Sequence, residues 1–119
     1  MSPRIKVLIA DDHTIVRSGV RLLLDAEPDV EVVGEALDGI EAVELTGRLQ
    51  PDVVLMDIAM PGMDGMEATR HIKAEWPQVN VLVLTMHRQD EYLFEVLKAG
   101  ASGYILKAAE TNELIHAVR

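Results

Sequence analysis

Five polar residues follow apolar stretches of the sequence and could act together in chemistry. They are Asp11, Asp12, Asp57, Thr85 and Lys107. Two carboxylates about 4 Å apart repel by about 4 kcal/mol at the effective dielectric of a protein surface, so three that converge favour a bound cation. Hard oxygen ligands with no His or Cys among them suit Mg²⁺, with Mn²⁺ as an alternative ion. The three aspartates therefore predict a metal site.

A phosphoryl group is the second ligand that this set implies. Lys107 can neutralise one phosphoryl oxygen, and Thr85 can donate a hydrogen bond to another. The cation can join a third oxygen to Asp57. Asp57 then becomes a nucleophile that forms an aspartyl phosphate.

Apolar, β-branched runs alternate with helical patterns along the chain. The runs cover residues 5–10, 30–33, 53–56, 81–84 and 103–106. The third run is unbroken rather than alternating, as in a strand that helices cover on both faces. Alternating strands and helices with right-handed crossovers give an α/β fold, in which a parallel sheet lies between helix layers. All strand carboxyl ends then share one edge, which brings the five polar residues together.

Five helices are expected between and after these strands. The first begins among the capping residues Asp11, Asp12 and Thr14 and stops near Pro28. Its apolar stripe consists of Ile15, Val16, Val20, Leu23 and Leu24. The other helices span residues 39–49, 66–76, 89–99 and 110–119. We therefore expect a single domain over residues 1–119.

Composition limits the classes of function. A chain of 119 residues, 49% of them hydrophobic, is sized for one domain with one core. It has no cysteine, which excludes disulfides and thiolate metal sites and favours the cytoplasm. A formal net charge of -9 repels polyphosphate backbones, so we expect this segment not to bind nucleic acid directly. The apolar run at residues 7–10 is too short for a signal peptide or a membrane span.

Taken together, these residues resemble the receiver domain of two-component response regulators over the whole chain. The matching motifs are the pair Asp11-Asp12, Asp57, the loop at 60–65, Thr85 and the segment 103–107. Residues 10–13, 16–19 and 84–87 are similar to the LuxR/NarL-type subfamily of transcription regulators. The resemblance implies a flavodoxin-like receiver fold, a five-stranded parallel sheet of order 2-1-3-4-5 with helices on both faces.

The resemblance also implies a role for each matched residue. Asp57 is the phosphoacceptor for a sensor histidine kinase, and Thr85 and Lys107 assist it. The metal ligands are Asp11, Asp12, Asp57 and the backbone carbonyl of Ala59. Thr85 and Tyr104 are the switch residues. Such a chain is no enzyme with an external substrate, because it only accepts a phosphoryl group and loses it again.

Three positions depart from the family's pattern. Ala108 stands where many receivers have a cis proline, Met86 where a small residue is common, and Thr14 where the subfamily often has proline. None of them removes a catalytic group. Water that attacks the acyl phosphate must pass Ala59, Met86 and His87, so we expect these gate residues to set the lifetime of the phosphorylated state.

The resemblance to transcription regulators predicts an output beyond this segment. The helical pattern at 110–119 stops without Gly, Pro or a polar tail. We therefore expect a C-terminal helix-turn-helix DNA-binding domain, absent from this sequence, that the receiver controls. Dimerisation on phosphorylation is the expected readout, because two DNA half-sites match two-fold protein symmetry.

Other functions remain open beside this one. A Mg²⁺-dependent phosphohydrolase would also use an aspartyl nucleophile, but no second carboxylate follows Asp57 as a general acid. A receiver used only for docking, without phosphorylation, is a further alternative. A nucleotide- or flavin-binding enzyme needs a glycine-rich turn after the first strand, where this chain has residues 11–14, Asp-Asp-His-Thr. The histidines share no metal-ligand spacing and are interpreted as surface or hydrogen-bonded residues; they are His13, His71, His87 and His116.

Overall fold

The computed structural model describes residues 4–57, 65–85 and 103–106. Strands and helices alternate through most of this part of the chain. Their bounds are β1 Ile5–Ala10, α1 Thr14–Asp25, β2 Val30–Ala36, α2 Gly39–Leu49, β3 Val53–Asp57, α3 Gly65–Glu75, β4 Asn80–Thr85 and β5 Gly103–Leu106. The expected helices at 89–99 and 110–119 lie outside the described residues.

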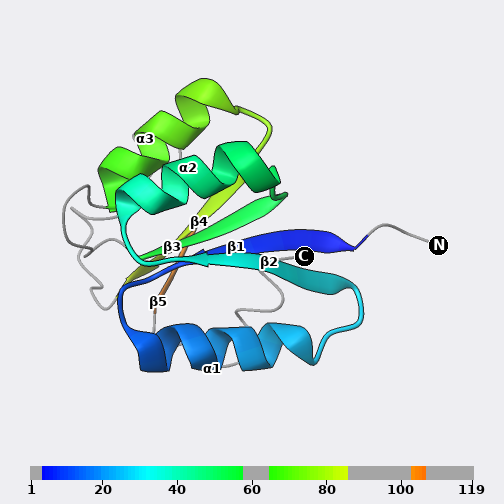
Figure 1. Cartoon of the computed structure of the whole chain (residues 1–119). Helices are drawn as coiled ribbons and strands as arrows, with labels where there is room; N and C mark the ends of the chain where they lie inside the picture. The colour runs from blue at the N-terminus through cyan, green and yellow to red at the C-terminus, as the bar shows by residue number, and fades with distance from the viewer. Residues whose placement is uncertain (1–3, 58–64, 86–102, 107–119) are drawn as a thin grey trace.

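The five strands form one parallel sheet. Their order is β2-β1-β3-β4-β5, which confirms the predicted topology. Figure 1 shows α2 and α3 together on one face of the sheet and α1 on the other. The carboxyl ends of all the strands therefore meet at one edge, as expected for a doubly wound sheet.

β3 is buried on both faces, and its residues alternate between two cores. Val54 and Met56 belong to the core that α2 and α3 cover, together with Ile72 of α3. Val53 and Leu55 belong to the core on the other face, where Leu24 of α1 is buried. This explains the unbroken apolar run, because a strand covered by helices on both sides needs apolar residues at every position.

β2 is longer than predicted. The sequence predicted a strand over 30–33, whereas β2 continues to Ala36. Its pairing with β1 shifts between Val7 and Leu8, where the partners are Val32 and Gly34. A Cβ at Gly34 would lie 2.8 Å from a methyl carbon of Leu49, so any larger residue there would require the Leu49 side chain of α2 to move. Glycine is unfavourable in strand interiors, so the sequence pattern ends before Gly34. Pairing with β1 nevertheless continues the strand through this position.

The prediction for α1 was wrong in two details. Ile15, assigned to the apolar stripe, is 88% exposed. The residue at the N-cap is His13, and no side chain caps the helix. The carboxylate of Asp11 instead accepts a hydrogen bond from the backbone N–H of His13, at 2.8 Å. Asp11 therefore orders the turn before the helix rather than the helix end itself.

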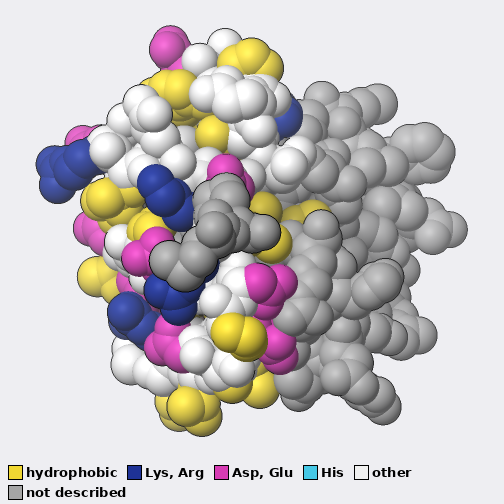
Figure 2. Space-filling view, turned by 90° about the vertical axis from the view of Figure 1, so that its right-hand side faces the viewer, with side chains coloured by type: hydrophobic (Ala, Val, Ile, Leu, Met, Phe, Trp, Pro, Cys, Tyr) yellow, Lys and Arg dark blue, Asp and Glu magenta, His cyan; other side chains and the backbone are white. Residues whose placement is uncertain are grey.

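The opposite edge of the sheet carries the amino ends of the strands. Asp52 joins two of them: its backbone N–H donates to Lys6 O at 2.8 Å, and its carbonyl accepts from Asn80 N at 3.1 Å. Figure 2 looks onto this side of the molecule, where Lys and Arg side chains lie among Asp and Glu side chains over the described part. Charges of both signs are therefore interspersed there. Among the described helices none is both long and apolar enough to cross a membrane.

Candidate functional site

Asp57 and Asp11 lie side by side at the carboxyl edge of the sheet. Ala10 of β1 pairs with Met56 of β3, so the next residue on each strand, Asp11 and Asp57, reaches the edge at the same level. Asp57 is only 2% exposed and Asp11 is fully buried. Buried carboxylates are uncommon unless they bind a cation or a hydrogen-bond donor, so their juxtaposition marks a binding site.

Two more side chains complete the group. Ligand atoms of Asp11, Asp12, His13 and Asp57 all lie within 4.8 Å of one another. The Nδ1 atom of His13 is 3.1 Å from Asp11 Oδ1, 3.2 Å from Asp12 Oδ1 and 3.8 Å from Asp57 Oδ2. His13 is 60% exposed and hydrogen-bonded to Asp11, as expected for a surface or hydrogen-bonded histidine, but the sequence did not predict its place beside the acids. The feature of the sequence that could have indicated this is the position of His13 directly after the acidic pair, in the same turn.

The loop that carries the acids is held by neighbouring elements. The backbone N–H of Asp11 donates to Ala36 O at the end of β2, at 3.0 Å. The guanidinium of Arg17 in α1 donates to Asp11 O at 2.8 Å and to Glu35 Oε1 at 3.1 Å. Arg21, one helical turn later, donates to the other oxygen of Glu35 at 2.6 Å. α1 and β2 therefore fix the backbone at the site from two sides.

Thr85 is the last residue of β4 and so lies at the same edge. In the backbone register, Asp57 pairs with Leu84, and Thr85 pairs with Leu106 of β5. Tyr104 pairs with Val83, two positions before Thr85. The backbone therefore brings Thr85 to the neighbouring strand end, as the sequence predicted. The remaining predicted site residues lie outside the described residues: Ala59, Met86, His87 and Lys107.

The donor set is chemically suited to a divalent cation. Three carboxylates offer the oxygen ligands that Mg²⁺ prefers, and part of the site is open to solvent, because Asp12 and His13 are exposed. A cation would also relieve the repulsion between neighbouring carboxylates. The described residues therefore fit Mg²⁺, and an anion such as a phosphoryl group could take a coordination position that the protein leaves open.

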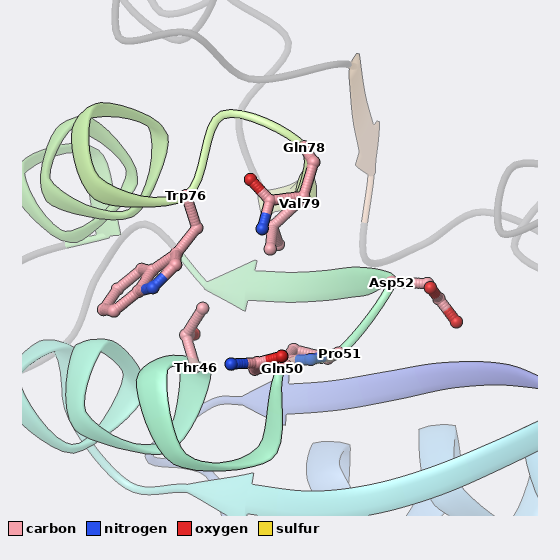
Figure 3. A pocket seen from close by; sticks show the side chains of 7 residues that line it. All are labelled: Thr46, Gln50, Pro51, Asp52, Trp76, Gln78 and Val79. Carbon is pink, nitrogen blue, oxygen red and sulfur yellow. The ribbon is translucent and has the colours of Figure 1, made fainter.

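A separate pocket of about 160 Å³ lies at the other end of β3. Figure 3 shows Trp76, which follows α3, beside Thr46 of α2 and across from Gln50. The pocket's lining is Thr46, Gln50, Pro51, Asp52, Trp76, Gln78 and Val79. Pro51 and Asp52 precede β3, whereas Asp57 ends it, so this pocket is not part of the acidic site.

Comparisons with known proteins agree with this geometry. Residues 7–119 match the family described as the response regulator receiver domain. The transcriptional regulatory protein DegU of Brevibacillus brevis is 48% identical over 116 residues, which are 98% of this chain and 49% of DegU. This chain thus spans about half the length of the curated relatives that it matches.

Solved structures superpose closely on the chain. A two-component response regulator of the LuxR family from Aurantimonas sp. SI85-9A1 does so with a TM-score of 0.92 at 40% identity, covering 97% of this chain and 82% of that one. The isolated REC domain of RcsB from Salmonella enterica serovar Typhimurium, in the presence of the phosphomimetic BeF3-, gives a TM-score of 0.89 at 34% identity, covering 97% and 86%. The fold is therefore shared with these proteins.

Proposed function

This chain belongs to the response regulator receiver domain family, and we propose that it accepts a phosphoryl group on Asp57 and thereby controls a transcriptional output. The observation that carries the proposal is the burial of Asp57 at the end of β3, with ligand atoms of Asp11 and Asp12 within 4.8 Å of its own. Such a carboxylate can act as a nucleophile only if nearby charge is compensated, which the cation-binding set provides.

The transfer uses few groups, and each has one task. A carboxylate oxygen of Asp57 attacks the phosphorus of a phosphohistidine on the partner kinase; a P–O bond forms as the P–N bond breaks, and the imidazole leaves. Mg²⁺, held by Asp11, Asp12, Asp57 and the carbonyl of Ala59, would offset the negative charge on the phosphoryl oxygens. Thr85 and Lys107 would each contact one phosphoryl oxygen.

Mass spectrometry of the intact chain after treatment with acetyl phosphate and Mg²⁺ tests the phosphoacceptor. We expect the wild type to gain one phosphoryl group and Asp57→Asn to gain none. Asp25→Asn is the matched control, because Asp25 is an exposed acid at the end of α1. The proposal fails if the Asp57→Asn variant is labelled on another aspartate at a comparable rate, or if Asp25→Asn loses labelling to the same extent.

The residues that limit water access give the phosphorylated state its lifetime. We assign this gate to Ala59, Met86 and His87, on the resemblance to the family. Met86→Ala and His87→Ala should change the rate of dephosphorylation while Asp57 stays the labelled residue. The rate at which the phosphorylated form decays after removal of acetyl phosphate measures this effect. An unchanged decay rate in both variants would contradict the assignment of these residues as a gate.

The output is a C-terminal helix-turn-helix domain in the longer protein, which the receiver controls by dimerisation. Support comes from DegU, which is about twice as long as the matched segment and is a transcriptional regulatory protein. The signal would pass from the phosphoryl group through Thr85 and Tyr104, whose strands are adjacent. Light scattering and operator binding of the full-length protein, with and without a phosphoryl mimic, test it. If neither self-association nor DNA affinity changes, the output proposal is wrong even where Asp57 is labelled.

A further inference from the structure

The pocket beside Trp76 lies at the end of β3 opposite to Asp57. Its lining comes from the end of α2, the residues before β3 and the segment between α3 and β4. We propose that this pocket is a second binding site, for an uncharged planar ring that carries an amide, such as a pyrimidine base or nicotinamide. The inference does not depend on phosphorylation, because the pocket and the acidic group share no residue.

The volume of the pocket limits the ligand to one ring. The pocket encloses about 160 Å³. A cavity of about 150 Å³ is large enough for one benzene-sized molecule, whereas sites for drug-sized ligands start at about 300 Å³. A pyrimidine base or nicotinamide therefore fits, and a dinucleotide does not.

The side of the pocket that Trp76 and Gln78 form is held by contacts outside the pocket. The indole packs on the backbone of α2, since a Cβ at Gly47 would lie 2.8 Å from its Cζ2 atom. Lys73 Nζ donates hydrogen bonds to the carbonyl oxygens of the residues on either side of Gln78, at 2.9 and 2.8 Å. This side is therefore ordered without a ligand, as small-molecule sites usually are.

Gln50 lies on the facing side, and its backbone conformation is unusual. Its φ is 48°, and among the described residues it is the one residue other than glycine with a positive φ. This left-handed conformation favours glycine, and residues other than glycine that adopt it cluster at binding sites. The backbone N–H of Gln50 donates to Thr46 O at 3.0 Å, which ends α2. Figure 3 shows the Gln50 side chain across the pocket from Gln78.

The lining provides one aromatic surface and several neutral hydrogen-bonding groups. A planar ring can stack on the indole in an offset geometry. Each glutamine amide offers donors and an acceptor, so Gln50 and Gln78 can bind an amide edge from two sides. The Thr46 hydroxyl donates to Ala42 O at 2.7 Å, so its oxygen is left only to accept. Within the described part of the chain, neither amide nor the indole N–H of Trp76 has a hydrogen-bond partner, which leaves these groups available to a ligand.

The charges around the pocket disfavour an anionic ligand. Among the described residues that line it, Asp52 is the one with an ionisable side chain. Asp52 Oδ2 accepts from the backbone N–H of Lys6 at 2.9 Å, and Figure 3 shows the carboxylate directed away from Trp76. The nearby Lys73 ammonium is engaged by backbone carbonyls, and the chain has a formal net charge of -9. A phosphate or carboxylate on the ligand would find no cation here, so the free base or amide is favoured over a nucleotide or an acid.

A chemical-shift titration of the intact chain tests the proposal, with uracil and nicotinamide as probes and nicotinate as the matched anion. Trp76 is the one tryptophan of the chain, so its indole N–H gives a single signal in a proton–nitrogen correlation spectrum. We expect a saturable shift of this signal with both amide probes. Nicotinate should bind at least about tenfold more weakly than nicotinamide, because its charge would be left without a partner.

Two variants show whether the glutamine amides bind the probes. Gln78→Met keeps the length of the side chain and removes its amide. Gln50→Gly removes the other amide and suits the left-handed backbone, so this variant should remain folded even if Gln78→Met does not. Each variant should bind nicotinamide about three- to tenfold more weakly, as expected for one or two lost hydrogen bonds. Glu75→Met is the matched control, because Glu75 is an exposed residue of α3 that does not line the pocket, and it should bind nicotinamide as the wild type does.

Three results would overturn the proposal. If neither amide probe gives a saturable shift of the indole signal, the pocket holds only water. Equal affinities for nicotinate and nicotinamide would contradict the selection against anions. Unchanged nicotinamide binding by both glutamine variants, or an equal loss in Glu75→Met, would show that the two amides do not form the site.

Discussion

The Nη1 atom of Arg17 donates a 2.8 Å hydrogen bond to the backbone carbonyl oxygen of Asp11. The same guanidinium binds Glu35 of β2, and the Arg17 side chain is only 13% exposed. Arg17 therefore joins α1, β2 and the turn that carries the acidic pair. Since a backbone held on both sides fixes the direction of its side chains, we interpret Arg17 as a positioning residue for the carboxylate of Asp11.

Arg17→Gln should weaken Mg²⁺ binding as well as the fold. We expect the affinity for Mg²⁺ to fall by about tenfold, the usual cost of losing a residue that orients a metal ligand. The free energy of unfolding should fall by about 2 kcal/mol, because hydrogen bonds to a charged, largely buried group are lost. Calorimetry with Mg²⁺ and urea unfolding measure the two effects.

Arg21→Gln is the control for this prediction. Arg21 also binds Glu35, but it is 43% exposed, and it forms ion pairs with Glu35 and Asp25 rather than a bond to the acidic turn. Its loss should leave Mg²⁺ affinity within about twofold and cost under about 1 kcal/mol, as for exposed ion pairs. Equal losses of Mg²⁺ affinity in the two variants would show that Glu35, rather than the bond to Asp11, carries the effect.

The burial of Asp57 beside two other acids predicts an effect of its charge on stability. Asp57→Asn removes one of three neighbouring negative charges, so in EDTA the variant should be about 1 to 3 kcal/mol more stable than the wild type. Trp76, the chain's one tryptophan, can report urea unfolding by its fluorescence. If the Asn variant is less stable than the wild type in EDTA, the interactions that Asp57 makes in the folded state stabilise the protein by more than the charge repulsion destabilises it.

Mg²⁺ should narrow or reverse this difference in stability between Asp57→Asn and the wild type. An ion that binds only the folded state adds about 2.7 kcal/mol when its concentration is roughly 100 times the dissociation constant. The wild type should gain this stabilisation, and Asp57→Asn should gain much less, since one ligand has lost its charge. Asp25→Asn, changed at an exposed position of α1, should respond to Mg²⁺ as the wild type does.

The sequence was sufficient for the sheet and for the place of Asp57. Unbroken apolar runs predicted strands covered on both faces, and the acid that ends the third run lies at the edge of β3. Ile15 could not be placed this way, because a helical stripe gives the direction of a residue but not how far the sheet extends beneath it. Ile15 lies in the first turn of α1 and is 88% exposed, whereas Leu24 lies in the last turn and is buried, so the stripe is covered at only one end of the helix.

The place of His13 beside the acids could not be predicted in this way. None of the four histidines has metal-ligand spacing to another histidine, and such spacing does not reveal contacts between a histidine and acids. The structure instead combines one histidine with acids from two strand ends, since Asp57 is 44 residues away from His13 in sequence but only 3.8 Å away in space. Only the topology of the sheet brings those residues together.

The packing of Trp76 on α2 gives a last prediction, in which two similar substitutions have opposite effects. A Cβ at Gly47 would lie 2.8 Å from Cζ2 and 3.1 Å from Cη2 of the Trp76 indole. The indole stands beside the neighbouring Thr46 in Figure 3. At Gly19 in α1 a Cβ would meet nothing within 4 Å. Both glycines are inside helices, where alanine is favoured over glycine by about 1 kcal/mol.

Gly19→Ala should therefore raise the free energy of unfolding by about 0.5 to 1 kcal/mol, because the helix gains and nothing is displaced. Gly47→Ala should lower it by about 1 to 3 kcal/mol, because the indole must move out of its packed position and this outweighs the gain in helix propensity. Urea unfolding measures both, and the emission maximum of folded Gly47→Ala should shift as Trp76 is displaced, whereas that of Gly19→Ala should not. Equal stabilisation by the two substitutions, with no spectral shift, would mean that Trp76 does not pack against Gly47 in solution.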